Sequence, residues 1–272
     1  MSILLCRHVE RRPSASGTWC HRESARVRHI ASGHVPSSLG HACQRCAIRQ
    51  RALCGAISDA ALARLVHRRR APAGNLILDG EHEPGWIAVI LSGVVKLLKT
   101  AADGRRPIVG LQFPGQFVGR PGGKPSPFLA EAASDVELCC FAGTSFEAAM
   151  RENRDLEHVV MQQTLDELDV ARQWMFVLGR KTAQEKVASL LLLMAHHLAS
   201  DPDAAPSANK TIEFELPLSR TEMAEYLGLT IETVSRQVSN LKAGGVISIK
   251  GARVVSVPDL AALSDWSERN LS

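Results

Sequence analysis

The sequence lacks the features that define several common classes of protein. It has no run of about 18 consecutive apolar residues, the length typical of a membrane-spanning helix. Its first residues lack the order and length of a secretory signal peptide. A phosphate-cradling glycine loop, a catalytic motif and a second cysteine cluster are also missing. We therefore expect a cytoplasmic protein that has no membrane contact, is not an enzyme and has no disulfides, because the cytosol keeps thiols reduced.

Most of the chain also lacks any excess of charge. The first 42 residues carry a net charge of +4, whereas the remainder holds 26 basic and 26 acidic side chains. Residues 1–40 mix Arg, His, Ser, Gly and Pro without apolar periodicity, which predicts a disordered tail. Such a tail is an arm for nucleic-acid phosphates, a solvated extension, or the product of a start codon assigned too early. Any nucleic-acid binding by the rest of the chain must come from a local patch.

Short apolar runs separated by glycine-containing turns fill the region from Asn75 to Phe141. The runs are Leu76–Leu78, Ile87–Leu91, Val94–Leu98, Ile108–Phe113 and Val136–Phe141. Closely spaced strands with such turns predict an antiparallel β-barrel or jelly roll, within a chain of the α+β class. A short amphipathic helix is expected before it, starting at Ser58 or Asp59 and including Leu62, Leu65 and Val66.

A helical pattern begins after the last apolar run. Thr144 to Glu147 has the sequence of a capping box, and the pattern then continues to about Gly179. Along this helix a stripe of apolar or small residues recurs at alternating spacings of three and four, at Met161, Thr164, Leu168, Ala171, Met175 and Leu178. The stripe either docks on the chain's own core or forms the seam of a homodimer, which the length and position of the helix favour. A second capping box at Thr182 predicts another helix, ending near Leu198.

The next segment has the pattern of a helix-turn-helix. A capping box at Ser219 opens a first short helix, and Gly228 marks a tight turn. Thr230 is a natural N-cap for a second helix over residues 231–243, which ends at a pair of glycines. Two short helices joined by a glycine-containing turn are the plan of this DNA-binding motif.

In this plan the early residues of the second helix face the floor of the major groove. Here they are Glu232, Ser235 and Arg236, which the helical period places on one face. A carboxylate can accept a hydrogen bond from cytosine N4, and arginine can bind guanine O6 and N7 together. The alternative is a solvated, salt-bridged helix face. Apolar runs at residues 246–249 and 254–257 predict a hairpin wing.

Three cysteines, Cys43, Cys46 and Cys54, precede the predicted barrel. Thiolates are soft ligands for iron–sulfur clusters or zinc, and a four-ligand site needs one more donor. Spacing alone leaves both groups open, with His41 available as the fourth ligand of a zinc site.

The segment from Leu216 to Arg236, LPLSRTEMAEYLGLTIETVSR, resembles the recognition region of the Crp/Fnr superfamily of transcription regulators. The predicted barrel, long helix and winged domain occur in that family's order, so the resemblance covers roughly residues 43–265. It implies a regulator that binds palindromic double-stranded DNA as a homodimer. The E-x-x-S-R signature implies TTGAT-type half-sites, read by the three residues of the second helix named above.

The resemblance also implies a cofactor. In the branch that contains the fumarate and nitrate reduction regulator, N-terminal cysteines and one barrel cysteine hold a 4Fe-4S cluster. Carried over to this sequence, the implied ligands are Cys43, Cys46, Cys54 and Cys139, the last near the end of the final strand. Cys140 is the weaker candidate because neighbouring strand residues point to opposite faces. Cys6 and Cys20 match nothing in the family.

The mechanism implied by the resemblance is oxygen sensing. Under low oxygen an intact cluster favours the dimer, whose recognition helices enter successive major grooves, and oxygen destroys the cluster and releases the DNA. Because the predicted seam carries no charged residue, we expect the dimer to persist partly without the cluster. The loop at residues 103–106 is a candidate contact with RNA polymerase. Phe113 to Ala133 lacks the acidic ribose contact and the Arg-Ser or Arg-Thr pair of cyclic-nucleotide-binding members, so that ligand is not expected.

These expectations divide the chain into four parts. They are a tail (1–40), a cysteine-bearing segment with the barrel sensor domain (41–143), a dimerisation helix with Met161, Leu168, Ala171 and Met175 at the interface (144–180), and a winged helix-turn-helix domain (181–272). Three other functions compete with this one. They are a related regulator without a cluster that is controlled by thiol oxidation or by its own abundance, an iron–sulfur enzyme or electron-transfer protein, and a zinc-stabilised structural DNA-binding protein.

Overall fold

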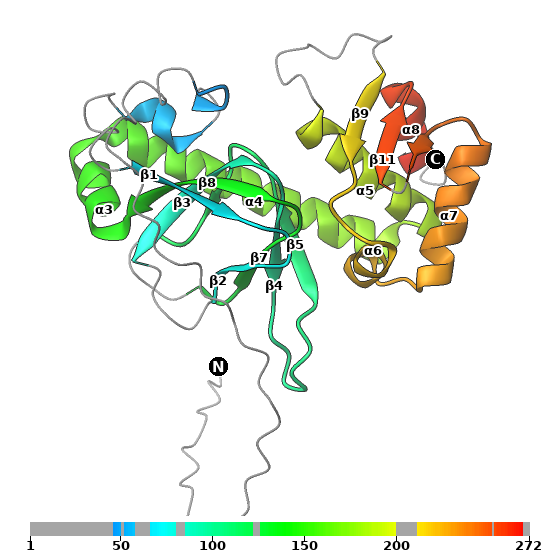
Figure 1. Cartoon of the computed structure of the whole chain (residues 1–272), viewed down its shortest axis with the longest axis horizontal. Coiled ribbons are helices and arrows are strands. Elements are labelled where there is room, and N and C mark those ends of the chain that lie inside the picture. The colour runs from blue at the N-terminus through cyan, green and yellow to red at the C-terminus, as the bar shows by residue number, and fades with distance from the viewer. Residues whose placement is uncertain are drawn as a thin grey trace, which may run out of the picture.

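The computed structural model describes residues 46–49, 52–57, 66–79, 85–121, 126–199, 211–251 and 253–268. Figure 1 shows a β-barrel and a C-terminal domain joined by the long helix α4. The elements are, in chain order, η2 (Leu53–Ala56), β1 (Val66–Ala71), β2 (Leu76–Leu78), β3 (Trp86–Ser92), β4 (Val95–Leu98), β5 (Ile108–Gln112), β6 (Phe117–Val118), β7 (Leu129–Ala132), β8 (Val136–Ala142), α3 (Gly143–Glu152), α4 (Arg154–Arg180), α5 (Ala183–Leu198), β9 (Ile212–Glu215), α6 (Arg220–Leu227), α7 (Ile231–Ala243), β10 (Ser248–Lys250), β11 (Val254–Val257) and α8 (Leu260–Glu268).

The barrel consists of two four-stranded antiparallel sheets, in the strand orders β1-β8-β3-β6 and β2-β7-β4-β5. One buried cluster draws residues from both sheets, among them Ile90 of β3, Val95 of β4 and Leu138 of β8. Side chains alternate between the two faces of a strand, so each sheet also presents a second apolar face. The predicted jelly roll and the α+β class are confirmed.

The outer faces of the two sheets are covered by different parts of the chain. The sheet that contains β8 packs against η2, α3 and the start of α4, in a cluster that includes Phe141, Phe146 and Leu156. The sheet that contains β4 contributes Leu98 and Leu129 to a larger cluster with α5 and the C-terminal domain. The barrel therefore contacts the described residues 46–49 and 52–57, here called the cysteine segment, on one side and the C-terminal domain on the other.

Strand β1 corrects the expectation of a helix through Val66. Val66 is instead the first residue of β1, paired with Phe141 of β8. Strand β1 lies at the edge of its sheet, where its arginines reach Glu137, with Arg68 Nη1 3.4 Å from the carboxylate. Residues 58–65 of the predicted helix lie outside the described residues. Strands β6 and β7 were also not predicted.

The capping box expected at Thr144 does not form. Helix α3 begins at Gly143, and its N-cap, Ala142, has no side-chain hydrogen bond. The Gly143 amide donates instead to the carbonyl of Gly85, at 2.9 Å, which ties the end of β8 to the start of β3. This backbone contact sets the start of the helix, and Thr144 falls within its first turn.

The single helix expected from Thr144 to about Gly179 is interrupted at Asn153, between α3 and α4. Asn153 has extended backbone angles, and its side chain accepts hydrogen bonds from the amides of Asp155 and Leu156. Asparagine is a preferred N-cap, so this residue starts a new helix. The helix predicted from Thr182 to Leu198 is confirmed as α5, with its capping box formed. None of the described helices combines the length and apolar character needed to cross a membrane.

Candidate DNA-reading helix and cysteine site

The two helices of the predicted helix-turn-helix form as expected. The side chain of Ser219 accepts from the Glu222 amide, and the Glu222 carboxylate accepts from the Ser219 amide, at 3.2 and 2.8 Å. Gly228 then takes a left-handed conformation, with φ of 62°. The turn requires this geometry, and glycine adopts it without steric cost. Thr230 caps α7 by accepting from the Thr233 amide at 3.2 Å.

Helix α7 has one buried face and one exposed face. Val234, Val238 and Leu241 are buried in the core of the domain. Glu232, Ser235 and Arg236 are all exposed on the other face, as the helical period predicts. Hydrogen bonds from the backbone amide of Glu232 itself and from Thr230 lower the pKa of the Glu232 carboxyl. This carboxylate is therefore ionised near neutral pH, the state that accepts from a cytosine amino group.

A small sheet supports the wing. Strand β11 pairs with β10 on one side and with β9 on the other. At the tip, the ammonium of Lys250 forms an ion pair with Glu213 of β9. The wing was predicted as a hairpin, and β9 as its third strand was not.

Two of the predicted cluster ligands lie in one buried region. Cys54 lies in η2 and Cys139 in β8, each with 5% of its surface exposed, and both belong to the apolar cluster under η2 and α4. The fold thus brings a cysteine of the N-terminal segment into the same cluster as the barrel cysteine.

Cys140 faces the other way. It lies opposite Ala88 and His67 in the sheet and is packed in the cluster between the two sheets. Burial raises the pKa of Cys140 to about 12. The side chain is therefore a protonated core thiol, and its orientation agrees with the choice of Cys139 as the candidate ligand.

The other two candidate ligands are Cys43 and Cys46. Cys46 is half-buried at the start of the described segment, while Cys43 and His41 lie outside the described residues. Within the described part of the chain, no three Cys, His, Asp or Glu side chains are close enough together to hold a metal ion. Four cysteine thiolates are suitable ligands for an iron–sulfur cluster, and two of them, Cys54 and Cys139, lie in the same buried region. The other two ligands would come from residues 43–46.

Helix α4 anchors the cysteine segment. The side-chain amide of Asn153, at the start of α4, donates to the carbonyl of Ala56 in η2 at 2.7 Å. Arg49 donates to the carbonyl of Ile57 at 3.4 Å. Any rearrangement of the cysteine segment would therefore reach the start of α4 directly.

The predicted seam along α4 is exposed in the single chain. Met161, Leu168 and Met175 are 60%, 43% and 73% exposed, although all are large apolar side chains. Thr164, Ala171 and Leu178 are exposed as well. A second copy of the chain would cover such a stripe, and the interface residues stay a prediction.

The loop proposed to contact RNA polymerase projects from the barrel between β4 and β5. Arg105 donates to the Asp103 carboxylate at 2.7 Å, which folds the turn on itself, and Arg106 is exposed. This arrangement suits either a solvated turn or a contact surface.

Comparisons with known proteins agree with this architecture. Residues 185–266 match the model of a Crp-like helix-turn-helix domain, and residues 68–153 match that of a cyclic nucleotide-binding domain. The chain is 43% identical over 235 residues to the transcriptional activator protein FnrL of Cereibacter sphaeroides, covering 84% of this chain and 92% of that one. It is 38% identical over 213 residues to the nitrogen fixation regulation protein FixK of Bradyrhizobium diazoefficiens, covering 77% and 87%. The solved structure of FixK2 from Bradyrhizobium japonicum matches with a TM-score of 0.65 at 30% identity, covering 74% and 97%.

The chain belongs to the Crp/Fnr family of transcription regulators. Like these relatives, it is a DNA-binding regulator and not an enzyme. The family order of barrel, long helix and winged domain, predicted from the sequence, is confirmed.

The residues on either side of β6 include two of the positions on which the expectation about cyclic nucleotides rests. Gln116 points its side chain back along the turn and accepts a hydrogen bond from the Phe113 amide at 2.8 Å. Arg120 precedes a proline and has no serine or threonine after it. The absence of cyclic-nucleotide binding therefore stays a prediction, which rests on these two positions.

Proposed function

We propose that this Crp/Fnr regulator binds palindromic TTGAT-type promoter sites as a homodimer in the cytoplasm, and that it senses oxygen through a 4Fe-4S cluster. The observation that carries the proposal is the shared location of Cys54 and Cys139 in one buried cluster beside α4. Relatives named as transcriptional activators, including FnrL of Cereibacter sphaeroides, support a role in activation through RNA polymerase.

In this proposal Cys43, Cys46, Cys54 and Cys139 hold the cluster. A bound 4Fe-4S cluster would be the group that reacts with oxygen. The apolar residues around Cys54 and Cys139, including Leu53 and Phe141, limit the access of water to the site. Binding four thiolates would fix the cysteine segment against the barrel. The Asn153 contact passes that constraint to the start of α4.

At the other end of α4, the exposed face of α7 reads DNA. Two recognition helices related by the dimer axis enter major grooves one turn apart. Arg236 would bind guanine and Glu232 cytosine, and Ser235 would contact a neighbouring base or phosphate. Release of the segment after cluster loss weakens the dimer and lowers the affinity for paired half-sites.

The test is anaerobic purification with measurement of iron, sulfide and the visible spectrum before and after exposure to air. We expect about four irons per chain and a brown absorption band that bleaches in air. Cys139→Ala should abolish the iron. The neighbouring variant Cys140→Ala removes another buried thiol, from the opposite strand face, and should keep the iron, which makes it the matched control.

Three results would change the proposal. A colourless, iron-free protein that still binds TTGAT-type DNA would retain the regulator and replace the cluster by control through thiols or abundance. Zinc in place of iron would identify a structural metal site. Equal loss of iron in Cys139→Ala and Cys140→Ala would reject Cys139 as the barrel ligand.

A further inference from the structure

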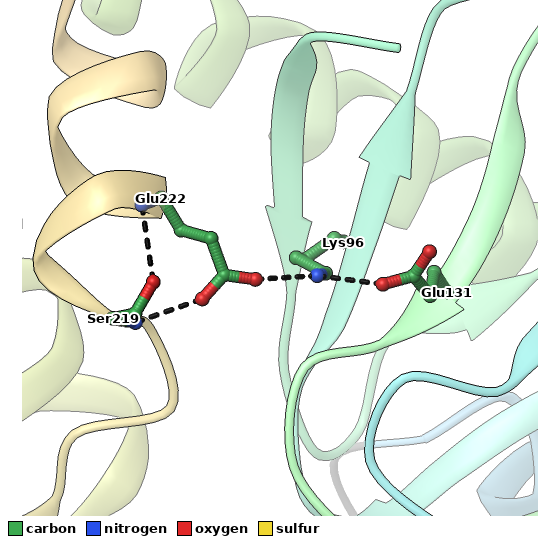
Figure 2. Close-up of polar contacts among 4 residues, drawn as sticks. All are labelled: Lys96, Glu131, Ser219 and Glu222. Carbon is green, nitrogen blue, oxygen red and sulfur yellow. Dashed lines mark hydrogen bonds and ion pairs between the residues drawn. The ribbon is translucent and has the colours of Figure 1, made fainter.

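A buried lysine of the barrel contacts the first helix of the helix-turn-helix. The Nζ of Lys96, in β4, lies 2.6 Å from Oε1 of Glu222 in α6 and 2.7 Å from Oε1 of Glu131 in β7. The Lys96 side chain is only 9% exposed. Figure 2 shows the lysine between the two carboxylates, one from each domain.

Each oxygen of the Glu222 carboxylate has a separate partner. Oε2 accepts from the Ser219 amide and completes the capping box of α6, while Oε1 accepts from Lys96. The capping box holds the carboxylate rigidly on its own helix. The lysine therefore contacts a fixed point of the DNA-binding domain rather than a mobile side chain.

The lysine stays charged in this position. Burial lowers the pKa of Lys96, but its hydrogen bonds and charge interactions with Glu131 and Glu222 raise it above the ordinary value overall. Removal of one partner from a buried ion pair leaves an uncompensated charge, so such a contact strongly favours one geometry.

A second contact holds the same helix one turn further along, at Tyr226. Trp174 of α4 packs on Tyr226 of α6, with ring centroids 5.0 Å apart. Tyr226 is buried, and α7 packs on α6 in the same core. The barrel and the long helix together therefore fix the direction of the recognition helix.

We propose that Lys96 is a positioning residue that acts through Glu222 to orient the helix-turn-helix on the barrel. In the dimer this orientation selects the spacing between the two half-sites that the protein accepts. The inference rests on the proposed dimeric DNA binding. It gives the barrel a part in DNA specificity, although Lys96 itself does not contact DNA.

The test is a double-mutant cycle with Lys96→Met and Glu222→Gln. Glutamine also completes a capping box at this position, so Glu222→Gln removes the charge and retains the cap. Dissociation constants are measured for a TTGAT-type palindrome and for the same half-sites moved apart by one or two base pairs. Discrimination is the ratio of the dissociation constants for the shifted and the normal spacing. We expect this ratio to fall roughly tenfold in each single variant. In the double variant it should fall no further, because the effects of substituting two residues in contact are not additive.

Three measurements separate positioning from other roles. Lys99→Met is the matched control, since Lys99 follows the same strand, is exposed and donates to the carbonyl of Pro127. It should leave the discrimination unchanged. Discrimination against a substituted base within a half-site should also be unchanged in Lys96→Met. The dependence of affinity on salt should keep its slope, because that slope counts phosphate contacts.

The outcomes are distinct. Additive effects in the cycle, unchanged spacing discrimination in both single variants, or an equal effect of Lys99→Met would each overturn the role of Lys96. If Lys96→Met does not fold, Glu222→Gln alone carries the test with the same expected loss. A wild-type protein that binds none of these DNAs would instead reject the proposed function.

Discussion

At the scale of single residues, Arg236 has the most specific predicted role. Its guanidinium is exposed on α7, one helical turn from Glu232, and can bind both acceptors of a guanine. We expect Arg236→Ala to weaken binding to a TTGAT-type palindrome by roughly 10- to 100-fold for each half-site, since each such contact contributes about 1–3 kcal/mol. Fluorescence anisotropy with cognate DNA and with DNA altered at the guanine measures this loss. The variant should no longer distinguish the two.

Lys242→Ala is the control for Arg236. Lys242 is also basic and exposed, but it lies in the last turn of α7, away from the base-reading end. Its loss should weaken cognate and altered DNA by similar factors, as expected of a phosphate contact. If Arg236→Ala behaved in the same way, Arg236 would be a phosphate contact and not a base-reading residue.

At the scale of secondary-structure elements, Asn153 joins the cysteine segment to α4. Its Oδ1 caps the helix, and its Nδ2 holds the carbonyl of Ala56. We expect Asn153→Ala to lower the free energy of unfolding by about 0.5–2 kcal/mol, the usual cost of losing an N-cap, as measured by urea denaturation.

The variant Asn153→Asp separates the two functions of this side chain. Aspartate is an equally good N-cap, but it cannot donate to Ala56. Most of the stability should therefore remain, while amide hydrogen exchange accelerates at residues 52–57. Unchanged exchange in Asn153→Asp would show that other contacts hold the segment.

The stripe on α4 gives a second prediction for this element. Leu168→Glu places a charge in the middle of the predicted seam, whereas Gln173→Glu places one at an exposed position off the seam. In sedimentation experiments Leu168→Glu should be monomeric, and Gln173→Glu should remain dimeric. Because the seam carries no charge, the air-exposed wild type should stay partly dimeric at micromolar concentration. A purely monomeric cluster-free protein would contradict this expectation.

Prediction from sequence succeeded where local signals decide the structure. The capping boxes at Thr182 and Ser219 form as predicted, and strand alternation placed Cys139 and Cys140 on opposite faces. The capping box at Thr144 failed because a backbone contact with Gly85 starts the helix earlier. Local sequence contains no information about such a partner.

Long-range polar contacts were the main omission. Strand β1 was not predicted because its sequence, VHRRRA, does not alternate between apolar and charged residues. Its arginines are accommodated by Glu137 on the neighbouring strand, which pairs with Arg68 and Arg70. The local sequence does not reveal this partner. Lys96 and Glu222 are 126 positions apart, and each has an ordinary local explanation as a strand or capping residue. Only the fold reveals that they meet.

At the scale of the whole molecule, a cavity of about 780 Å³ lies where the barrel, α4, the end of α5 and the cysteine segment meet. Glu167 of α4 lines this cavity, and burial raises its pKa to about 7, although a hydrogen bond from Gln112 opposes the shift. The ionisable groups Asp166, His196 and His197 also line it. This junction should therefore make stability depend on pH in the physiological range.

The sign of the dependence on Glu167 follows from its raised pKa. The folded state prefers the protonated acid, so the stabilisation is complete below the ordinary pKa of 4.5 and is lost as the pH rises through about 7. Glu167→Gln resembles the protonated form at every pH. We expect the Tm of this variant to match the wild type below about pH 4.5, to exceed it increasingly as the pH rises to about 7, and to keep this excess at pH 8.

His197 opposes this trend in the wild type, because burial and the neighbouring His196 lower its pKa. Its stabilising contribution is present above the ordinary value of 6.5 and is lost as the pH falls below that value through the lowered pKa of the folded state. The His197 imidazole is present in both the wild type and Glu167→Gln, so its effect on Tm cancels in the difference between the two proteins.

Asp169→Asn, an exposed change on the same helix, should give a difference in Tm that is constant with pH. If Glu167→Gln gave a constant difference as well, the carboxyl would be ionised throughout this range and the junction would be open to water. An increasing difference would instead show that the contact of barrel, α4 and α5 persists in solution, which is the same arrangement that Lys96 needs to orient α6.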